Sequence, residues 1–122
     1  MKTGSISLVI PAYNESENLV PLHKQIVDVL DGLSCTAEII FVDDGSRDSS
    51  ASILKDLAKK DPRVKVVLFA RNYGQTAAMG AGIKFASGEV IVPLDADMQN
   101  DPADIPKLIA KLEEGYDIVS GW

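Results

Sequence analysis

The hydrophobic positions of this chain fall into short runs separated by amphipathic stretches. The runs are brief and rich in β-branched residues, which predicts buried strands. These predicted strands lie at residues 6–10, 38–42, 64–69, 90–94 and 117–120. Pro11 is expected to stop the first strand, because proline cannot donate a hydrogen bond to a sheet ladder.

Between the runs, apolar residues recur at the three- and four-residue spacing of helices. The first helix is expected to begin with a capping box of Asn14 and Glu17 and to end near Gly32. Its inward stripe is predicted to contain Leu19, Leu22, Ile26, Val29, Leu30 and Leu33. The second helix should stop at Asp61-Pro62, and its predicted inward residues are Ile53, Leu54, Leu57 and Ala58.

Two further helices are predicted in the second half of the chain. The third, over residues 75–86, is small and apolar almost all round, so we expect it to be deeply packed, with Gly80 and Gly82 serving helix packing. The fourth begins at Asp101-Pro102 and ends at Gly115. Its inward stripe is Ile105, Leu108, Ile109 and Leu112.

This alternation of strands and helices predicts an α/β fold. We expect a three-layer sandwich in which helices cover both faces of a mainly parallel sheet. The length of 122 residues is that of a single domain, so the whole of 1–122 is assigned to it.

Acidic residues collect where predicted parallel strands end. Because such ends share one edge of the sheet, Glu15, Asp43, Asp44, Asp95 and Asp97 should lie along it. Clustered carboxylates repel one another unless solvent, hydrogen bonds or a cation relieves them.

The pair of Asp95 and Asp97 is spaced to hold one Mg²⁺ or Mn²⁺, with Gln99 able to add a neutral oxygen. The alternative for this pair is a solvated turn in which Asp101 caps the next helix. Tyr13, at a strand exit, is equally compatible with stacking on a nucleobase and with a place in the core or rim.

Composition excludes several classes of function. With 12 basic and 18 acidic residues the net charge is −6, and no basic run offsets it, so nucleic acid is not expected as a partner. Cys35 is the only cysteine, which indicates a reducing compartment, and the chain itself is expected to be soluble and cytoplasmic. His23 is interpreted as a packed or surface histidine, and no calcium-binding EF-hand loop or catalytic triad can be assembled.

Four segments carry a resemblance to the inverting glycosyltransferases of family 2, and within it to the polyprenyl-phosphate (dolichol- or undecaprenyl-phosphate) sugar transferases. They are Val9-Ile10-Pro11-Ala12-Tyr13-Asn14-Glu15, Val42-Asp43-Asp44-Gly45-Ser46-Arg47-Asp48, Arg71-Asn72-Tyr73-Gly74-Gln75 and Leu94-Asp95-Ala96-Asp97-Met98-Gln99. The resemblance implies the GT-A fold and a donor sugar linked to UDP or GDP. It also implies inverting, metal-dependent transfer to a lipid phosphate, which is already ionised and has little need of a general base.

The same resemblance assigns residues to roles. It implies a nucleoside site made of Pro11, Tyr13, Glu15, Val42 and Asp44. Ala96 would lie against the ribose, Asp95, Asp97 and Gln99 would bind the metal and diphosphate, and Asp97 is the residue given a catalytic role. The role of Arg71-Asn72 stays open between positioning a helix start and closing the pocket floor.

Members of this family extend well past 122 residues. We therefore expect a donor-binding N-terminal part that binds nucleotide sugar weakly and turns over little alone, with the lipid-phosphate acceptor bound by sequence outside it. The full-length protein is expected at the cytoplasmic face of the membrane, and a homo-oligomer is compatible with this picture. Alternatives are transfer to a saccharide, a nucleotidyltransferase, a domain that binds without transferring, and a phospho-receiver module, which needs acidic residues where Pro11-Ala12-Tyr13 stands.

Overall fold

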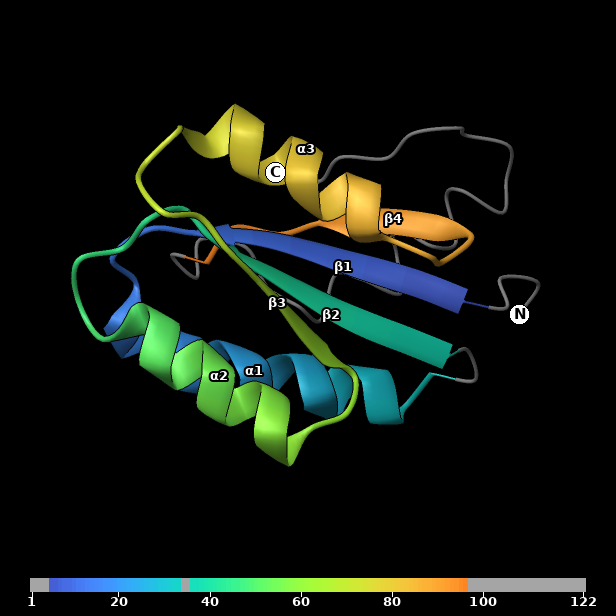
Figure 1. Cartoon of the computed structure of the whole chain (residues 1–122). Coiled ribbons are helices and arrows are strands. Elements are labelled where there is room, and N and C mark those ends of the chain that lie inside the picture. The colour runs from blue at the N-terminus through green and yellow to red at the C-terminus, as the bar shows by residue number, and fades with distance from the viewer. Residues whose placement is uncertain (1–4, 34–35, 97–122) are drawn as a thin grey trace.

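A computed structural model describes residues 5–33 and 36–96 of the chain. Within these residues one parallel sheet has the strand order β3-β2-β1-β4 (Figure 1). Its strands are β1 (Ser5–Ala12), β2 (Thr36–Asp43), β3 (Val64–Leu68) and β4 (Val90–Pro93). The helices between them are α1 (Ser16–Asp31), α2 (Ser50–Lys60) and α3 (Gln75–Phe85).

The expected three-layer α/β arrangement is confirmed. Helices α1 and α2 cover one face of the sheet and α3 covers the other (Figure 1). The chain builds the sheet outward from β1 to β3 and then returns to place β4 on the opposite side of β1. This reversal leaves a switch point between β1 and β4, where open α/β sheets bind their ligands. The predicted fourth helix and fifth strand lie outside the described residues.

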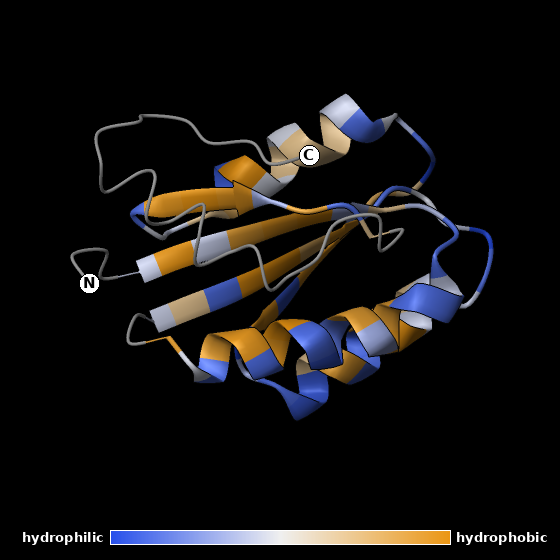
Figure 2. Cartoon of the chain, turned by 180° about the vertical axis from the view of Figure 1, so that it is seen from behind, coloured by the Kyte–Doolittle hydropathy of each residue, from blue (hydrophilic) through white to orange (hydrophobic). Residues whose placement is uncertain are grey.

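Successive side chains of the central strands point to opposite faces of the sheet, and both sets are buried. Ile6, Leu8 and Ile10 of β1 join Leu19, Leu22 and Ile26 of α1 in the larger cluster. Val9 packs with Ile40, Val42 and Ala78 in the smaller cluster under α3. The strands are accordingly apolar, whereas α1 and α2 carry hydrophilic residues away from the sheet (Figure 2). None of the helices in the described part of the chain is both long and apolar enough to cross a membrane.

The prediction that Pro11 stops the first strand is wrong. β1 continues to Ala12, with Pro11 in register with Val42. The Ala12 carbonyl accepts a hydrogen bond from Asp44 N, so the alternation of the backbone turns Pro11 towards the β4 side. The β4 register ends at the pair of Val9 and Pro93, so Pro11 interrupts no hydrogen bond.

The predicted capping box at Asn14 and Glu17 is also wrong. Helix α1 begins at Ser16, and the residue before it, Glu15, makes no capping hydrogen bond with its side chain. Asn14 instead has a φ of 54°, a left-handed conformation that asparagine tolerates. Its side chain is used for a contact with a distant loop, described below, and so is not free to cap its own helix.

Helix α3 is less deeply packed than predicted. Ala78 and Gly82 face the sheet, while Ile83 and Phe85 are 45% and 60% exposed. A Cβ at Gly82 would overlap Val9 and approach the Val42 Cγ2 atom to 3.2 Å, which confirms a packing role for this glycine. At Gly80 no described residue lies within 4 Å of the same position, so the described part of the chain does not support its predicted packing role.

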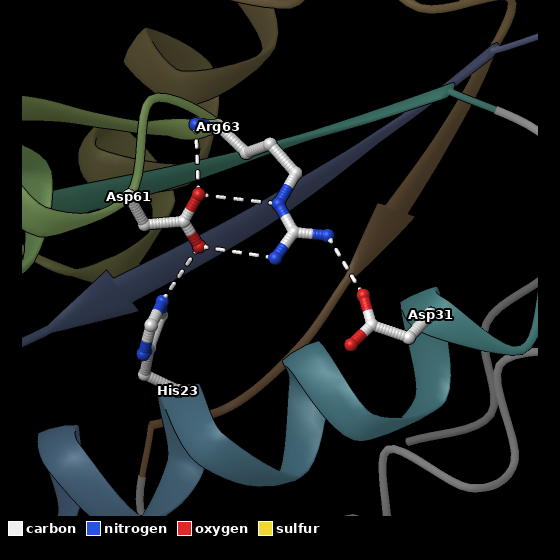
Figure 3. A network of polar contacts seen from close by, with 4 residues as sticks. All are labelled: His23, Asp31, Asp61 and Arg63. Atoms are coloured by element: carbon white, nitrogen blue, oxygen red, sulfur yellow. Dashed lines mark hydrogen bonds and ion pairs between the residues drawn. The ribbon is translucent and has the colours of Figure 1, made fainter.

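His23 takes part in a polar network that joins α1 to the turn before β3 (Figure 3). His23 Nε2 lies 2.9 Å from Asp61 Oδ2, and Arg63 Nε donates to Asp61 Oδ1 at 3.1 Å. Arg63 also reaches Asp31 Oδ1 at 3.4 Å. Burial opposes the ionisation of Asp61, but the hydrogen bonds from Arg63 and His23 outweigh it and lower the pKa of Asp61 to about 2. The structural interpretation of His23 fits this arrangement.

Candidate functional site

A hollow of about 150 Å³ opens at the carboxyl edge of the sheet, at the switch point between β1 and β4. Three strand ends and the first turn of α3 contribute to its walls. The lining residues are Pro11, Ala12, Tyr13, Glu15, Asp44, Gln75, Asp95 and Ala96.

Most of the candidate residues that the structure describes meet in this hollow. Pro11, Tyr13, Glu15, Asp44, Asp95 and Ala96 all line it. Val42 does not, because its side chain is fully buried beneath α3. Asp97 and Gln99 lie outside the described residues, so their assigned roles stay predictions.

The turn after β1 is held in place by the loop between β2 and α2. Asn14 N donates to Ser46 Oγ at 2.8 Å, and Arg47 N donates to Asn14 Oδ1 at 2.8 Å. Glu15 N donates to the buried Ser50 Oγ at 3.1 Å. These contacts span more than 30 residues of sequence. They fix the backbone on both sides of Asn14, so Tyr13 and Glu15 are presented at the rim of the hollow.

Asp44 joins the end of β2 to the start of α3. The residue is only 3% exposed. One carboxylate oxygen accepts from Tyr73 N at 2.7 Å. The other accepts from Gly74 N and from Asn72 Nδ2, each at 3.0 Å. A carboxylate stabilises the positive end of a helix, so Asp44 anchors α3 while it also lines the hollow.

For Asn72 the contacts fit the interpretation that it positions the start of the helix, which stays a prediction. Its amide holds both the side chain and the backbone carbonyl of Asp44. A Cβ at Gly45, whose φ is 69°, would overlap the backbone of Arg71. The two loops therefore meet backbone to backbone, as glycine permits. The Arg71 guanidinium lies 4.9 Å from the centre of the Tyr73 ring.

Gln75 lines the hollow and makes a side-chain contact there. No role was predicted for it from the sequence. It is the first residue of α3, and its Nε2 lies 3.2 Å from Asp95 Oδ1. The sequence signal that could have identified Gln75 is its position. It directly follows Gly74, in a segment that comes after a strand of the same sheet. Ala12 was missed as a lining residue because its small side chain carries no chemistry.

Asp43 differs sharply from its neighbour Asp44. It is also 3% exposed, but none of the residues that the structure describes forms a hydrogen bond with its Oδ1. Strand alternation turns Asp43 towards the α1 and α2 face, away from the α3 start that Asp44 holds. A buried carboxylate oxygen without a partner is costly, so within the described residues Asp43 Oδ1 contrasts with the fully hydrogen-bonded carboxylate of Asp44.

A divalent cation fits the chemistry of this edge. Glu15, Asp44 and Asp95 supply the oxygen donors that Mg²⁺ and Mn²⁺ prefer. Among residues 5–33 and 36–96, however, no three acidic, histidine or cysteine side chains are close enough together to hold a metal. The metal, and the roles of Asp97 and Gln99 in binding it, stay predictions.

Known structures with this fold include TarS and a mannosyltransferase. The TarS fragment 1–349 of S. aureus superposes with a TM-score of 0.68 at 21% identity, over 90% of this chain and 32% of that one. The mannosyltransferase PcManGT of Pyrobaculum calidifontis, solved with GDP-Man and Mn²⁺, gives a TM-score of 0.60 at 26% identity. That match covers 75% of this chain and 27% of PcManGT.

Sequence relatives point to one group of transferases. The undecaprenyl-phosphate 4-deoxy-4-formamido-L-arabinose transferase of Salmonella choleraesuis is 46% identical over 115 residues. The enzyme of the same name from Proteus mirabilis is 44% identical over 119 residues. These matches cover 93% and 97% of this chain but only 35% and 36% of the relatives, so the chain spans about a third of their length. The family model for glycosyl transferase family 2 matches residues 7–122, and the chain belongs to that family.

Proposed function

We propose that this chain is the donor-binding part of an inverting transferase that moves a sugar from a nucleoside diphosphate to a polyprenyl phosphate. The observation that carries the proposal is the hollow at the switch point. There Tyr13 and Glu15, which follow β1, line the same hollow as Asp95 and Ala96, which follow β4.

The hollow divides naturally between the two ends of a nucleotide sugar. Tyr13 is 41% exposed, which leaves its ring available to a nucleobase, and Glu15 beside it can accept from base N–H groups. Asp95 and Ala96 would take the ribose and diphosphate side. At about 150 Å³ the hollow is smaller than a typical ligand pocket of about 300 Å³ or more, so it encloses only part of such a ligand.

The reaction then requires little covalent chemistry from this part of the protein. An oxygen of the lipid phosphate attacks the anomeric carbon, the bond from that carbon to the diphosphate breaks, and the configuration inverts. A bound Mg²⁺ or Mn²⁺ supplies stabilisation of the charge that develops on the departing diphosphate. The carboxylates of the hollow orient the donor, and the acceptor needs no base because its phosphate is already ionised.

The relatives' names support a lipid-phosphate acceptor, since they are undecaprenyl-phosphate transferases. The whole transferase would bring its acceptor to the open side of the hollow and work at the cytoplasmic face of the membrane. Because this chain spans about a third of those relatives, we expect it to bind donor weakly and to transfer little or no sugar alone.

Binding of nucleotides to the 122-residue chain tests the proposal. Thermal shift and calorimetric titration with UDP, GDP and their sugar conjugates, with and without Mn²⁺, should reveal metal-dependent binding of one base. Asp95→Asn and Asp97→Asn should abolish the metal dependence. Asp56→Asn, in an exposed position on α2, should not. Absence of binding to either base at millimolar concentration refutes the proposal, and sugar transfer by this chain alone refutes the division of labour.

A further inference from the structure

A continuous polar path joins the ends of two strands, β2 and β4, through the start of α3 at the hollow. It starts with Asp44 at the end of β2, which holds the backbone N–H groups of Tyr73 and Gly74. It continues through the first residue of α3, Gln75, whose amide reaches Asp95 in the loop after β4. The Asp44 carboxylate, after β2, thus fixes the start of α3. The first side chain of α3, that of Gln75, contacts the Asp95 carboxylate after β4.

The backbone at Gly74 makes this path possible. Its φ of 105° is a backbone conformation that residues other than glycine rarely adopt. This turn lets the Gly74 N–H face Asp44 while α3 starts at the next residue. Gln75 therefore leaves a backbone anchored by Tyr73 and Gly74, and its side chain extends over the hollow.

In the contact between Gln75 and Asp95, the donor and acceptor roles are fixed by the chemistry of the two groups. An ionised carboxylate only accepts hydrogen bonds, so the Gln75 amide must present its N–H group to Asp95 Oδ1. Among the described residues, this contact to Oδ1 is the hydrogen bond that the structure shows for the Asp95 carboxylate. A glutamine fixes the orientation of the carboxylate without neutralising its charge, whereas a lysine would compete with a cation.

From this geometry we infer that Gln75 is a positioning residue of the donor site, which holds Asp95 in the orientation that receives the diphosphate and its cation. The inference rests on the proposed function. It assigns Gln75 no contact with the reacting atoms, because its action runs through Asp95. Supporting groups of this kind around a cation ligand commonly set affinity.

Two measurements on the 122-residue chain test the inference. In ¹H–¹⁵N spectra, the Gln75 side-chain amide, identified by its loss in Gln75→Met, should shift in Asp95→Ala and stay in place in Asp56→Asn. In titrations with UDP and GDP, Gln75→Met should weaken the Mn²⁺-dependent binding about three- to tenfold, the value of one hydrogen bond. Binding without Mn²⁺ and the midpoint of thermal unfolding should not change.

Methionine matches glutamine in length and helix propensity but cannot donate a hydrogen bond. Thr76→Ala, one residue further along the exposed side of α3, is the matched control and should leave affinity unchanged. If wild type binds nucleotide and Gln75→Met binds it equally well, or if the amide signal ignores Asp95→Ala, the inference is wrong while the proposed function stands. If wild type binds neither nucleotide, the proposed function fails, and the inference fails with it.

Discussion

Replacement of Asp44 by asparagine should destabilise the fold much more than the same change at Asp43. Both residues are 3% exposed, so their burial is matched; Asp43 is the last residue of β2 and Asp44 directly follows it. At Asp44 one amide oxygen can still accept from Tyr73 N. The new NH₂ group would then face two other donors, Gly74 N and Asn72 Nδ2.

The expected magnitude follows from those contacts. Two hydrogen bonds to a charged acceptor are lost, at about 1.5–3 kcal/mol each, so Asp44→Asn should cost about 3–6 kcal/mol in the free energy of unfolding. Asp43 Oδ1 has no partner to lose among the described residues, and the change removes a buried charge. Asp43→Asn should therefore cost less than about 1 kcal/mol, or stabilise the protein.

Urea unfolding followed by circular dichroism measures both variants, and hydrogen exchange at the Tyr73 and Gly74 amides locates the effect. Exchange at the Gly74 amide should accelerate in Asp44→Asn, while both amides stay slow in Asp43→Asn. Equal costs for the two variants, or a protected Gly74 amide in Asp44→Asn, would contradict the role of Asp44 as the anchor of α3.

Two further predictions concern packing and pH. Gly82→Ala should lower the free energy of unfolding by about 1–3 kcal/mol, because the new Cβ overlaps Val9. Gly80→Ala, on the same helix where no described residue lies within 4 Å, should raise it by about 0.5–1 kcal/mol. Urea midpoints that shift in the same direction for both variants would contradict this prediction. The pKa of Asp61 is lowered to about 2, so its ion pairs stabilise the fold above about pH 4 and lose this effect as the pH falls towards 2. Between those pH values wild type should lose about 1–2 kcal/mol more stability than Asp61→Asn, a figure reduced for partial solvent screening, and parallel pH profiles of the unfolding free energy would refute it.

The sequence by itself determined the elements and the edge at which the site lies. Brief β-branched runs separated by amphipathic stretches specify alternating strands and helices through local periodicity, which needs no knowledge of distant partners. Parallel strands then place their carboxyl ends together, so Tyr13, Glu15, Asp44 and Asp95 could be assigned to one edge from topology alone.

The tertiary structure decided which partner each polar group takes. Asn14 contacts Ser46 and Arg47 from more than 30 residues away and is no helix cap, and Pro11 extends β1 because no β4 residue pairs with it there. Glycines that look alike in sequence, Gly80 and Gly82, differ because one of them faces Val9. Hydrogen-bond partners and close contacts depend on the packing of segments far apart in the chain, and local patterns carry no record of that packing.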